Sequence, residues 1–163
     1  SFFLKGEEYS INAKEISGNK INLQIDNEKK ELIITYPKNL TEEEKKYNID
    51  RGIKKLLRYH TEIFLENRVP YWSKITNIQY KQFKVNDATS KYGSCMPSTK
   101  VMHFSSRLIM LPEDKIDAII VHELCHMIHP NHSKNFYSLV KEYIPNYDEI
   151  NKWLKANGKI ILF

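Results

Sequence analysis

The sequence has 163 residues, of which 41% are hydrophobic, and its 25 Lys and Arg residues against 20 Asp and Glu residues give a net charge of +5. This length suits one domain that buries a core of its own without disulfides. The basic excess is mild and forms no cluster interleaved with aromatic residues, so we do not expect nucleic acid as a partner.

Cysteine content and hydropathy indicate the compartment. The chain has only two cysteines, Cys95 and Cys125, too few for a disulfide scaffold, so we expect a cytoplasmic protein in a reducing environment. No apolar run approaches the roughly 18–20 residues that span a bilayer, and we expect no membrane partner. No signal-peptide pattern opens the sequence, but Ser rather than Met stands first, which leaves open an upstream targeting segment.

Residues 1–37 have the composition and alternation of short β-strands. Ile21, Leu23 and Ile25 alternate with polar residues, which is the period of a half-buried strand. The run Leu32–Tyr36 is rich in β-branched and aromatic residues and stops at a proline. Turn-forming residues separate these runs, so we expect an antiparallel β-meander of two or three strands that carries no chemistry.

A long helix with one apolar face is expected from about residue 41 to residue 68. Thr41, with Glu44 three residues later, has the form of a capping box. Apolar residues then recur at helical spacing, and charges of both signs occupy the remaining positions. Gly52 weakens the helix locally by about 1 kcal/mol, which allows a kink or break, and Pro70 is expected to close the helix.

A small sheet is expected between this helix and the next one. Residues 78–85 alternate apolar and polar side chains, and residues 100–105 resume the pattern of a short strand. The stretch between them, residues 86–98, is rich in small and turn-forming residues and is predicted to be a loop.

Pro112 and the acidic residues after it mark the start of a further helix. Its apolar positions form one stripe, made of Ile116, Ile119, Ile120, Leu124 and Met127. Pro130 blocks its continuation. Two shorter helices are expected over about residues 133–143 and 147–156, and the apolar tail over residues 160–163 is expected to dock as an edge strand or to pack on the core.

The second half of this helix carries the pattern His122-Glu123-Leu124-Cys125-His126. Residues four apart lie on one helix face, so the two imidazoles can converge on one metal ion. Zinc bound by such ligands activates water, and a neighbouring carboxylate can accept the proton as general base. His122 and His126 are therefore the expected zinc ligands, and Glu123 is the expected catalytic residue.

The third zinc ligand is expected to be His132, which follows a Pro-Asn turn that can bring it back over the metal. His129 would extend the same helical face, but three ligands spread over seven residues span about 10.5 Å of helix axis, too far for one ion. Pro130 could relax that geometry, so His129 stays an alternative, as does Glu142 from the next helix. Cys125 could bind zinc as a thiolate, but a packed thiol is the favoured interpretation.

Several segments resemble the YgjP-like metallopeptidase domain family, close to the SprT-like group of zincins. They are Tyr92–Cys95, Arg107–Ile109, Val121–His126 and Asn131–Phe136, and the likeness is specific over about residues 78–140. The resemblance implies a zincin-like fold in which one zinc ion is bound by His122, His126 and His132, with Glu123 catalytic. It also implies that the strand near residues 100–105 lies beside the cleft.

Two departures from the family pattern bear on substrate contacts and leave the metal ligands intact. The family often has Trp where Tyr92 stands, and Asn-Trp where this chain has Ser105-Ser106. Arg107 matches a family position, and we expect it either to stabilise an oxyanion or to make a structural ion pair.

These patterns predict an α+β single domain over residues 1–163, and the resemblance implies that it is zincin-like. Its N-terminal part (residues 1–37) is the β-meander, and residues 38–163 supply a helix, a small antiparallel or mixed sheet packed against the active-site helix, and a C-terminal helical part. We expect a zinc-dependent hydrolase, a metallopeptidase whose partner is a peptide or small-molecule substrate. The alternative is a hydrolase of nucleoside triphosphates, whose phosphates could meet Lys91, Lys100 and Arg107.

Overall fold

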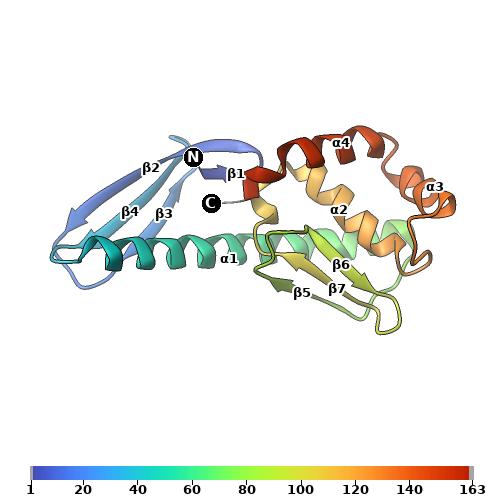
Figure 1. The fold of residues 1–163 in the computed structure, drawn as a ribbon, viewed down its shortest axis with the longest axis horizontal. Helices are drawn as coiled ribbons and strands as arrows, with labels where there is room; N and C mark the ends of the chain where they lie inside the picture. Colours follow the sequence, from blue (N-terminus) through green and yellow to red (C-terminus); the bar gives the residue numbers. More distant parts are fainter. Residues whose placement is uncertain (1, 162–163) are drawn as a thin grey trace.

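The long helix α1 (Glu42–Thr76) is the axis along which the rest of the molecule is arranged. The computed structural model describes residues 2–161. The N-terminal strands lie along the first half of α1, and the other helices and a second sheet lie along its second half (Figure 1). At about 1.5 Å per residue, the 35 residues of α1 are long enough to reach both halves. Within residues 2–161, no helix is both long and apolar enough to span a membrane.

Helix α1 extends further than the sequence predicts. Thr41 caps it as expected, accepting a hydrogen bond from the Glu44 N–H at 3.1 Å. The helix continues through Pro70 and ends at Asn77 in the left-handed conformation, so the prediction that Pro70 closes it is wrong. Pro70 deprives the Glu66 carbonyl of its helical donor, but both residues are exposed and water can serve that carbonyl.

Four strands form the N-terminal sheet, namely β1 (Phe2–Leu4), β2 (Glu7–Ile16), β3 (Asn22–Asp26) and β4 (Glu31–Pro37). Their order is β1-β2-β4-β3, with β2 parallel to β4 and the other pairs antiparallel. The predicted antiparallel β-meander is therefore wrong. Leu32 and Ile34 of β4 are fully buried, and a strand this apolar is best placed between two neighbours, so β2 and β3 flank it.

Gly52 lets this sheet approach α1 without breaking the helix. A Cβ atom at this position would lie 2.7 Å from Cδ1 of Leu23 on β3. The absence of a side chain thus costs helix propensity but allows sheet and helix to pack closely.

The second sheet has the order β5-β7-β6, with β5 (Gln82–Asn86), β6 (Gly93–Met96) and β7 (Val101–Ser105). The central strand β7 is parallel to β5 and antiparallel to β6. Two of the three strands were expected, although β5 begins later than predicted. The loop predicted over residues 86–98 is wrong where β6 lies, because its Gly-Ser-Cys-Met sequence has little β-propensity and its strand state comes from pairing with β7.

Three helices complete the chain, α2 (Glu113–Cys125), α3 (Lys134–Tyr143) and α4 (Tyr147–Asn157), and they begin where the sequence predicts. Short 3₁₀ turns, η1 (Leu108–Met110) and η2 (Gly158–Ile161), precede α2 and follow α4. Ile161 is buried, so the described part of the apolar tail packs on the core, and residues 162 and 163 lie outside the described residues. The predicted α+β class is confirmed.

Asp117 fastens α2 to α1. Its carboxylate accepts hydrogen bonds from Nε and Nη2 of Arg68 and from Nε1 of Trp72, all at 2.9 Å. The Arg68 guanidinium also lies 4.1 Å from the centroid of the Tyr71 ring. Asp117 is only 17% exposed, so solvent screens the pair only partly. Because α2 carries the histidine motif, this contact holds the motif against the scaffold.

We expect Asp117→Ala to lower the free energy of unfolding by about 2 kcal/mol, because Arg68 and Trp72 lose a charged acceptor in a half-buried setting. Chemical denaturation followed by circular dichroism measures the change. Glu62→Ala is the control, since the Glu62–Arg58 contact is 3.8 Å long and exposed and its loss should cost less than about 0.5 kcal/mol. Equal losses in the two variants would contradict the role given to Asp117.

Candidate metal centre

Three imidazoles converge at the C-terminal end of α2. The Nε2 atom of His126 lies 3.2 Å from that of His122 and 3.1 Å from that of His132, and the remaining pair is 3.4 Å apart. A zinc ion with tetrahedral bonds of about 2.0–2.1 Å separates its nitrogen ligands by about 3.3–3.4 Å, so the cluster fits this ion. Among residues 2–161, no other group of three or more His, Cys, Asp or Glu side chains is arranged to hold a metal.

Hydrogen bonds at Nδ1 of His122 and His126 determine which nitrogen of each ring faces the cluster as a lone pair. Nδ1 of His126 donates to the backbone carbonyl of His129 at 3.0 Å. A carbonyl only accepts, so Nδ1 carries the hydrogen and Nε2 of the neutral ring presents a lone pair to the cluster. Nδ1 of His122 lies 2.7 Å from the Tyr147 hydroxyl, which can fix the orientation of this ring in the same way.

The chain reverses sharply between the second and third histidines. Regular helix ends at Cys125, and His126 and Met127 donate their N–H groups to carbonyls three residues back, Glu123 and Leu124. Such tight turns are common where a helix ends, and here Pro130 forbids its continuation. The reversal carries His132 back to the other two rings, whereas a continuous helix would carry it away.

Helix α3 begins just after the third histidine and packs against the cluster through Phe136. Ser133 directly follows His132 and caps α3, accepting a hydrogen bond from the Phe136 N–H at 3.2 Å. The Phe136 ring is fully buried, and its centroid lies 4.9, 4.4 and 5.2 Å from the rings of His122, His126 and His132. This ring therefore packs against all three imidazoles and restricts their rotation.

Burial keeps two of the imidazoles neutral. Burial, followed by the proximity of His126 and His132, lowers the pKa of His122 to about 3. Burial also lowers the pKa of His126, while the His129 carbonyl acts in the opposite direction. Both rings are neutral at pH 7, which is the form that binds a metal ion.

Glu123 lies beside the cluster in a mostly buried position. Burial raises the pKa of its carboxyl to about 8, and the positive charge of Lys91 opposes this effect. A divalent cation next to the carboxyl would favour its charged form. Gly93 of the edge strand β6 approaches it so closely that a Cβ atom there would lie 3.1 Å from Oε2 of Glu123. The carboxylate of Glu123 therefore lies close to the backbone of β6.

The alternative ligands lie outside the cluster. His129 contributes its backbone carbonyl, and neither its ring nor Glu142 belongs to the group that the described residues form. Cys125 is fully buried, and burial, with a smaller effect of Glu142, raises the pKa of its thiol to about 12, so it is a packed neutral thiol. Arg107 is also buried and donates from Nη1 to the Ile161 carbonyl at 3.0 Å, which ties it to η2.

Comparison with known proteins identifies the family. A family model described as YgjP-like, metallopeptidase domain, matches residues 1–157. The chain belongs to the YgjP-like metallopeptidase domain family. The resemblance found in the sequence is confirmed, and the match extends it over the N-terminal sheet. As a member of this family, the YgjP-like chain is a metal-dependent hydrolase of the peptidase class.

Two solved structures share part of the fold of the YgjP-like chain. The metallopeptidase zymogen of Pyrococcus abyssi abylysin matches with a TM-score of 0.51 and 17% identity, over 57% of this chain and 94% of its own. The metallopeptidase zymogen of Methanocaldococcus jannaschii jannalysin matches with a TM-score of 0.51 and 21% identity, over 56% and 94%. At these identities the likeness concerns the fold alone, and it confirms the zincin-like architecture. No curated protein matches the chain.

Sequence reasoning missed two aromatic residues of the site. Tyr147 lies 25 residues from His122 in the chain and reaches it only because α4 packs against α2. Phe136 lies in a segment that resembles the family, but its contact with all three rings follows from the packing of α3 against α2. An aromatic residue at helical spacing is ordinarily a core residue, so neither position carries a signal of its own.

We expect Tyr147→Phe to weaken metal binding by roughly tenfold, because Nδ1 of His122 loses the partner that orients the ring. Competition with a chromogenic chelator measures the metal affinity. Tyr137→Phe is the matched control, since the Tyr137 ring stacks near His132 but its hydroxyl makes no hydrogen bond within the described residues. An unchanged affinity in Tyr147→Phe would show that packing alone orients His122.

Proposed function

We propose that the chain is a zinc-dependent peptidase in which His122, His126 and His132 bind one zinc ion and Glu123 is the general base. The observation that carries this proposal is the placement of three Nε2 atoms within 3.4 Å of one another beside a buried carboxylate. An imidazole binds a metal as an uncharged ligand, so a site of three imidazoles keeps the full charge of the ion for catalysis.

A zinc ion in this site would polarise a substrate carbonyl and lower the pKa of a water molecule beside it. Glu123 accepts the proton of the attacking water and passes it to the departing amine nitrogen. The low-dielectric surroundings of Glu123 strengthen both its contact with the water and the field of the ion. Tyr147 and the His129 carbonyl hold the rings of His122 and His126 while charge develops.

The edge strand β6 supports a peptide as substrate. Among residues 2–161 it pairs with β7 alone, which leaves its other edge to pair with an extended chain. Because Gly93 of β6 lies against Glu123, a peptide paired with this edge would run alongside the strand that contacts the carboxylate.

We expect Glu123→Gln to lower the rate of peptide hydrolysis by about 10²–10⁴, because the amide cannot accept the proton of the water. The zinc content, measured by elemental analysis, should remain near that of the unaltered protein. Full activity in this variant would rule out the mechanism.

His132→Ala should abolish stoichiometric zinc binding, because two imidazoles do not complete the site. His129→Ala should retain zinc, because it keeps the backbone carbonyl that accepts from His126. The zinc content of each variant after dialysis decides whether His132 or His129 is the third ligand. Loss of zinc in His129→Ala with retention in His132→Ala would make His129 the third ligand.

The reaction class is tested with the purified zinc-loaded protein on casein and on a panel of nucleoside triphosphates. Proteolysis that a chelator stops and added zinc restores is the expected result. Release of phosphate or pyrophosphate without proteolysis would overturn the peptidase proposal in favour of nucleotide hydrolysis.

A further inference from the structure

A cavity of about 550 Å³ opens beside His122 and Glu123. Its volume is in the range of pockets that bind small ligands or side chains, roughly 300–1,000 Å³. Because the cavity shares these two residues with the metal centre, a group that occupies it lies next to the reacting atoms.

The floor of the cavity is apolar. It is formed by α2, α4 and η2, which contribute Ala118, Ile119, Leu154 and Ile161, all of them buried. Such a floor accommodates methylene groups and removes water from whatever enters.

Three lysines surround this floor, and they come from separate parts of the chain. Lys91 precedes β6, Lys155 lies on α4 and Lys159 lies in η2, and all three are exposed. None of them makes an ion pair with a carboxylate within residues 2–161, and Glu123 is the only carboxylate among the lining residues. The cavity therefore presents unneutralised positive charge above an apolar floor, which favours an anionic group on an apolar stem.

The segment that carries Lys91 is held at both ends. The Ser106 N–H donates to the Asn86 carbonyl at 2.7 Å, and the Ser105 N–H donates to the Tyr92 carbonyl at 2.8 Å. The Tyr92 hydroxyl donates to the Leu154 carbonyl at 2.9 Å, so the segment is also tied to α4. These hydrogen bonds fix the position of the segment that forms this wall of the cavity, without any contribution from substrate.

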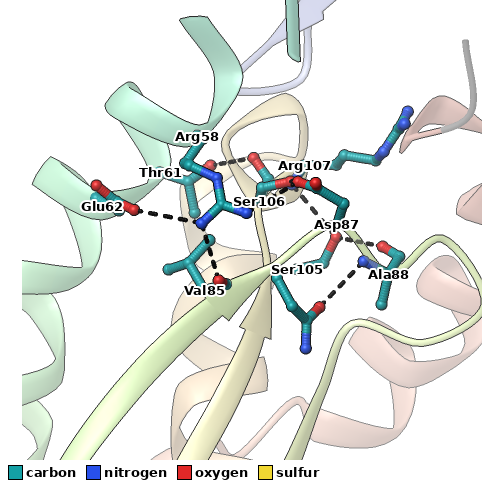
Figure 2. A network of polar contacts seen from close by, with 10 residues as sticks. Arg58, Thr61, Glu62, Val85, Asp87, Ala88, Ser105, Ser106 and Arg107 are labelled. Atoms are coloured by element: carbon teal, nitrogen blue, oxygen red, sulfur yellow. Dashed lines mark hydrogen bonds and ion pairs between the residues drawn. The ribbon is translucent and has the colours of Figure 1, made fainter. Parts of the chain in front are cut away.

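A second network anchors the beginning of this segment to α1. Figure 2 shows Arg58 reaching from α1 to Val85 and Asp87, with Ser106 beside Asp87. Asp87 accepts from Nη2 of Arg58 at 3.1 Å and from the Ser106 hydroxyl at 3.0 Å. The pair Ser105-Ser106, a departure from the family pattern, is thus the anchor of the wall that bears Lys91.

We propose that this cavity is a specificity pocket for a carboxylate of the peptide substrate, read by Lys91, Lys155 and Lys159 next to the bond that is cut. The inference rests on the proposed peptidase function and adds the substrate class to it. The carboxylate comes either from an Asp or Glu side chain beside the scissile bond or from a free C-terminus near it. The methylene groups of an acidic side chain would contact the apolar floor, and its carboxylate would lie at the lysines. A basic side chain would instead be repelled by the like charge of the lysines.

The first experiment maps cleavage sites with zinc-loaded protein on a library of mixed-sequence peptides, read by mass spectrometry. The expected result is enrichment of Asp and Glu at one position flanking the cut, or cuts clustered near free C-termini. Matched peptides that differ by Glu, Gln or Lys at that position, each with a free or an amidated C-terminus, then separate the two sources of the carboxylate.

The second experiment tests the lysines. The Glu peptide should be cut with a kcat/KM about tenfold above that of the Gln peptide, and Lys155→Gln with Lys159→Gln should reduce this ratio to about twofold, since exposed charge pairs each contribute a few-fold. Salt at 0.5 M should reduce it as well. The reversed pair, Lys155→Glu with Lys159→Glu, should prefer the Lys peptide.

Lys152→Gln is the matched control, because Lys152 lies on the same helix α4, is exposed and does not line the cavity. The Lys152→Gln variant should keep the tenfold preference for the Glu peptide over the Gln peptide. Two results would overturn the pocket and leave the peptidase proposal intact. One is equal cutting of the Glu and Gln peptides by the unaltered protein. The other is an unchanged preference for the Glu peptide in both double variants, the Gln pair and the Glu pair.

A binding measurement separates failure of the pocket from failure of the proposed function. Zinc-loaded Glu123→Gln protein is titrated with fluorescein-labelled Glu and Gln peptides, and fluorescence anisotropy should give a several-fold lower Kd for the Glu peptide. If no peptide and no casein is cut by the unaltered protein, the proposed function fails. Equal Kd values for the two peptides would then overturn the pocket too.

Discussion

Three imidazoles whose Nε2 atoms face one another at 3.1–3.4 Å are the constraint on which the rest of the structure depends. Lone pairs at this distance repel unless a cation or a proton lies between them, and burial removes the proton from His122 and His126. A metal ion is the natural complement of such a cluster. Membership of a metallopeptidase family agrees with this physical argument.

The surrounding elements serve to hold these rings in place. Helix α2 is fixed to α1 through Asp117, α3 begins immediately after His132 and places Phe136 against all three rings, and α4 brings the Tyr147 hydroxyl to His122. These contacts act by restricting ring orientation, which lowers the entropic cost of forming the metal site.

The site combines charges of both signs over a short distance. The Glu123 carboxylate lines the same cavity as His122, with Lys91 near enough to oppose the effect of burial on the pKa of this carboxyl. A cation at the cluster and the lysines at the cavity would attract two different oxygen-bearing groups of a peptide, a carbonyl and a carboxylate. Two such contacts at separate points orient a substrate better than either alone.

The local sequence predicts much of the helical part of this protein. The helix starts at Glu42, Glu113 and Lys134 follow from capping residues or acidic first turns, and the ligand pattern follows from the four-residue spacing of His122 and His126. These effects act over one or two helical turns. Tertiary structure decided the rest. The β2–β4 pairing, the strand state of β6 and the persistence of α1 through Pro70 depend on partners far away in the chain. The meeting of Tyr147 with His122, and of three lysines around one cavity, depends on how α2, α4 and the segment before β6 pack, and no local pattern encodes the relative placement of segments so distant in sequence.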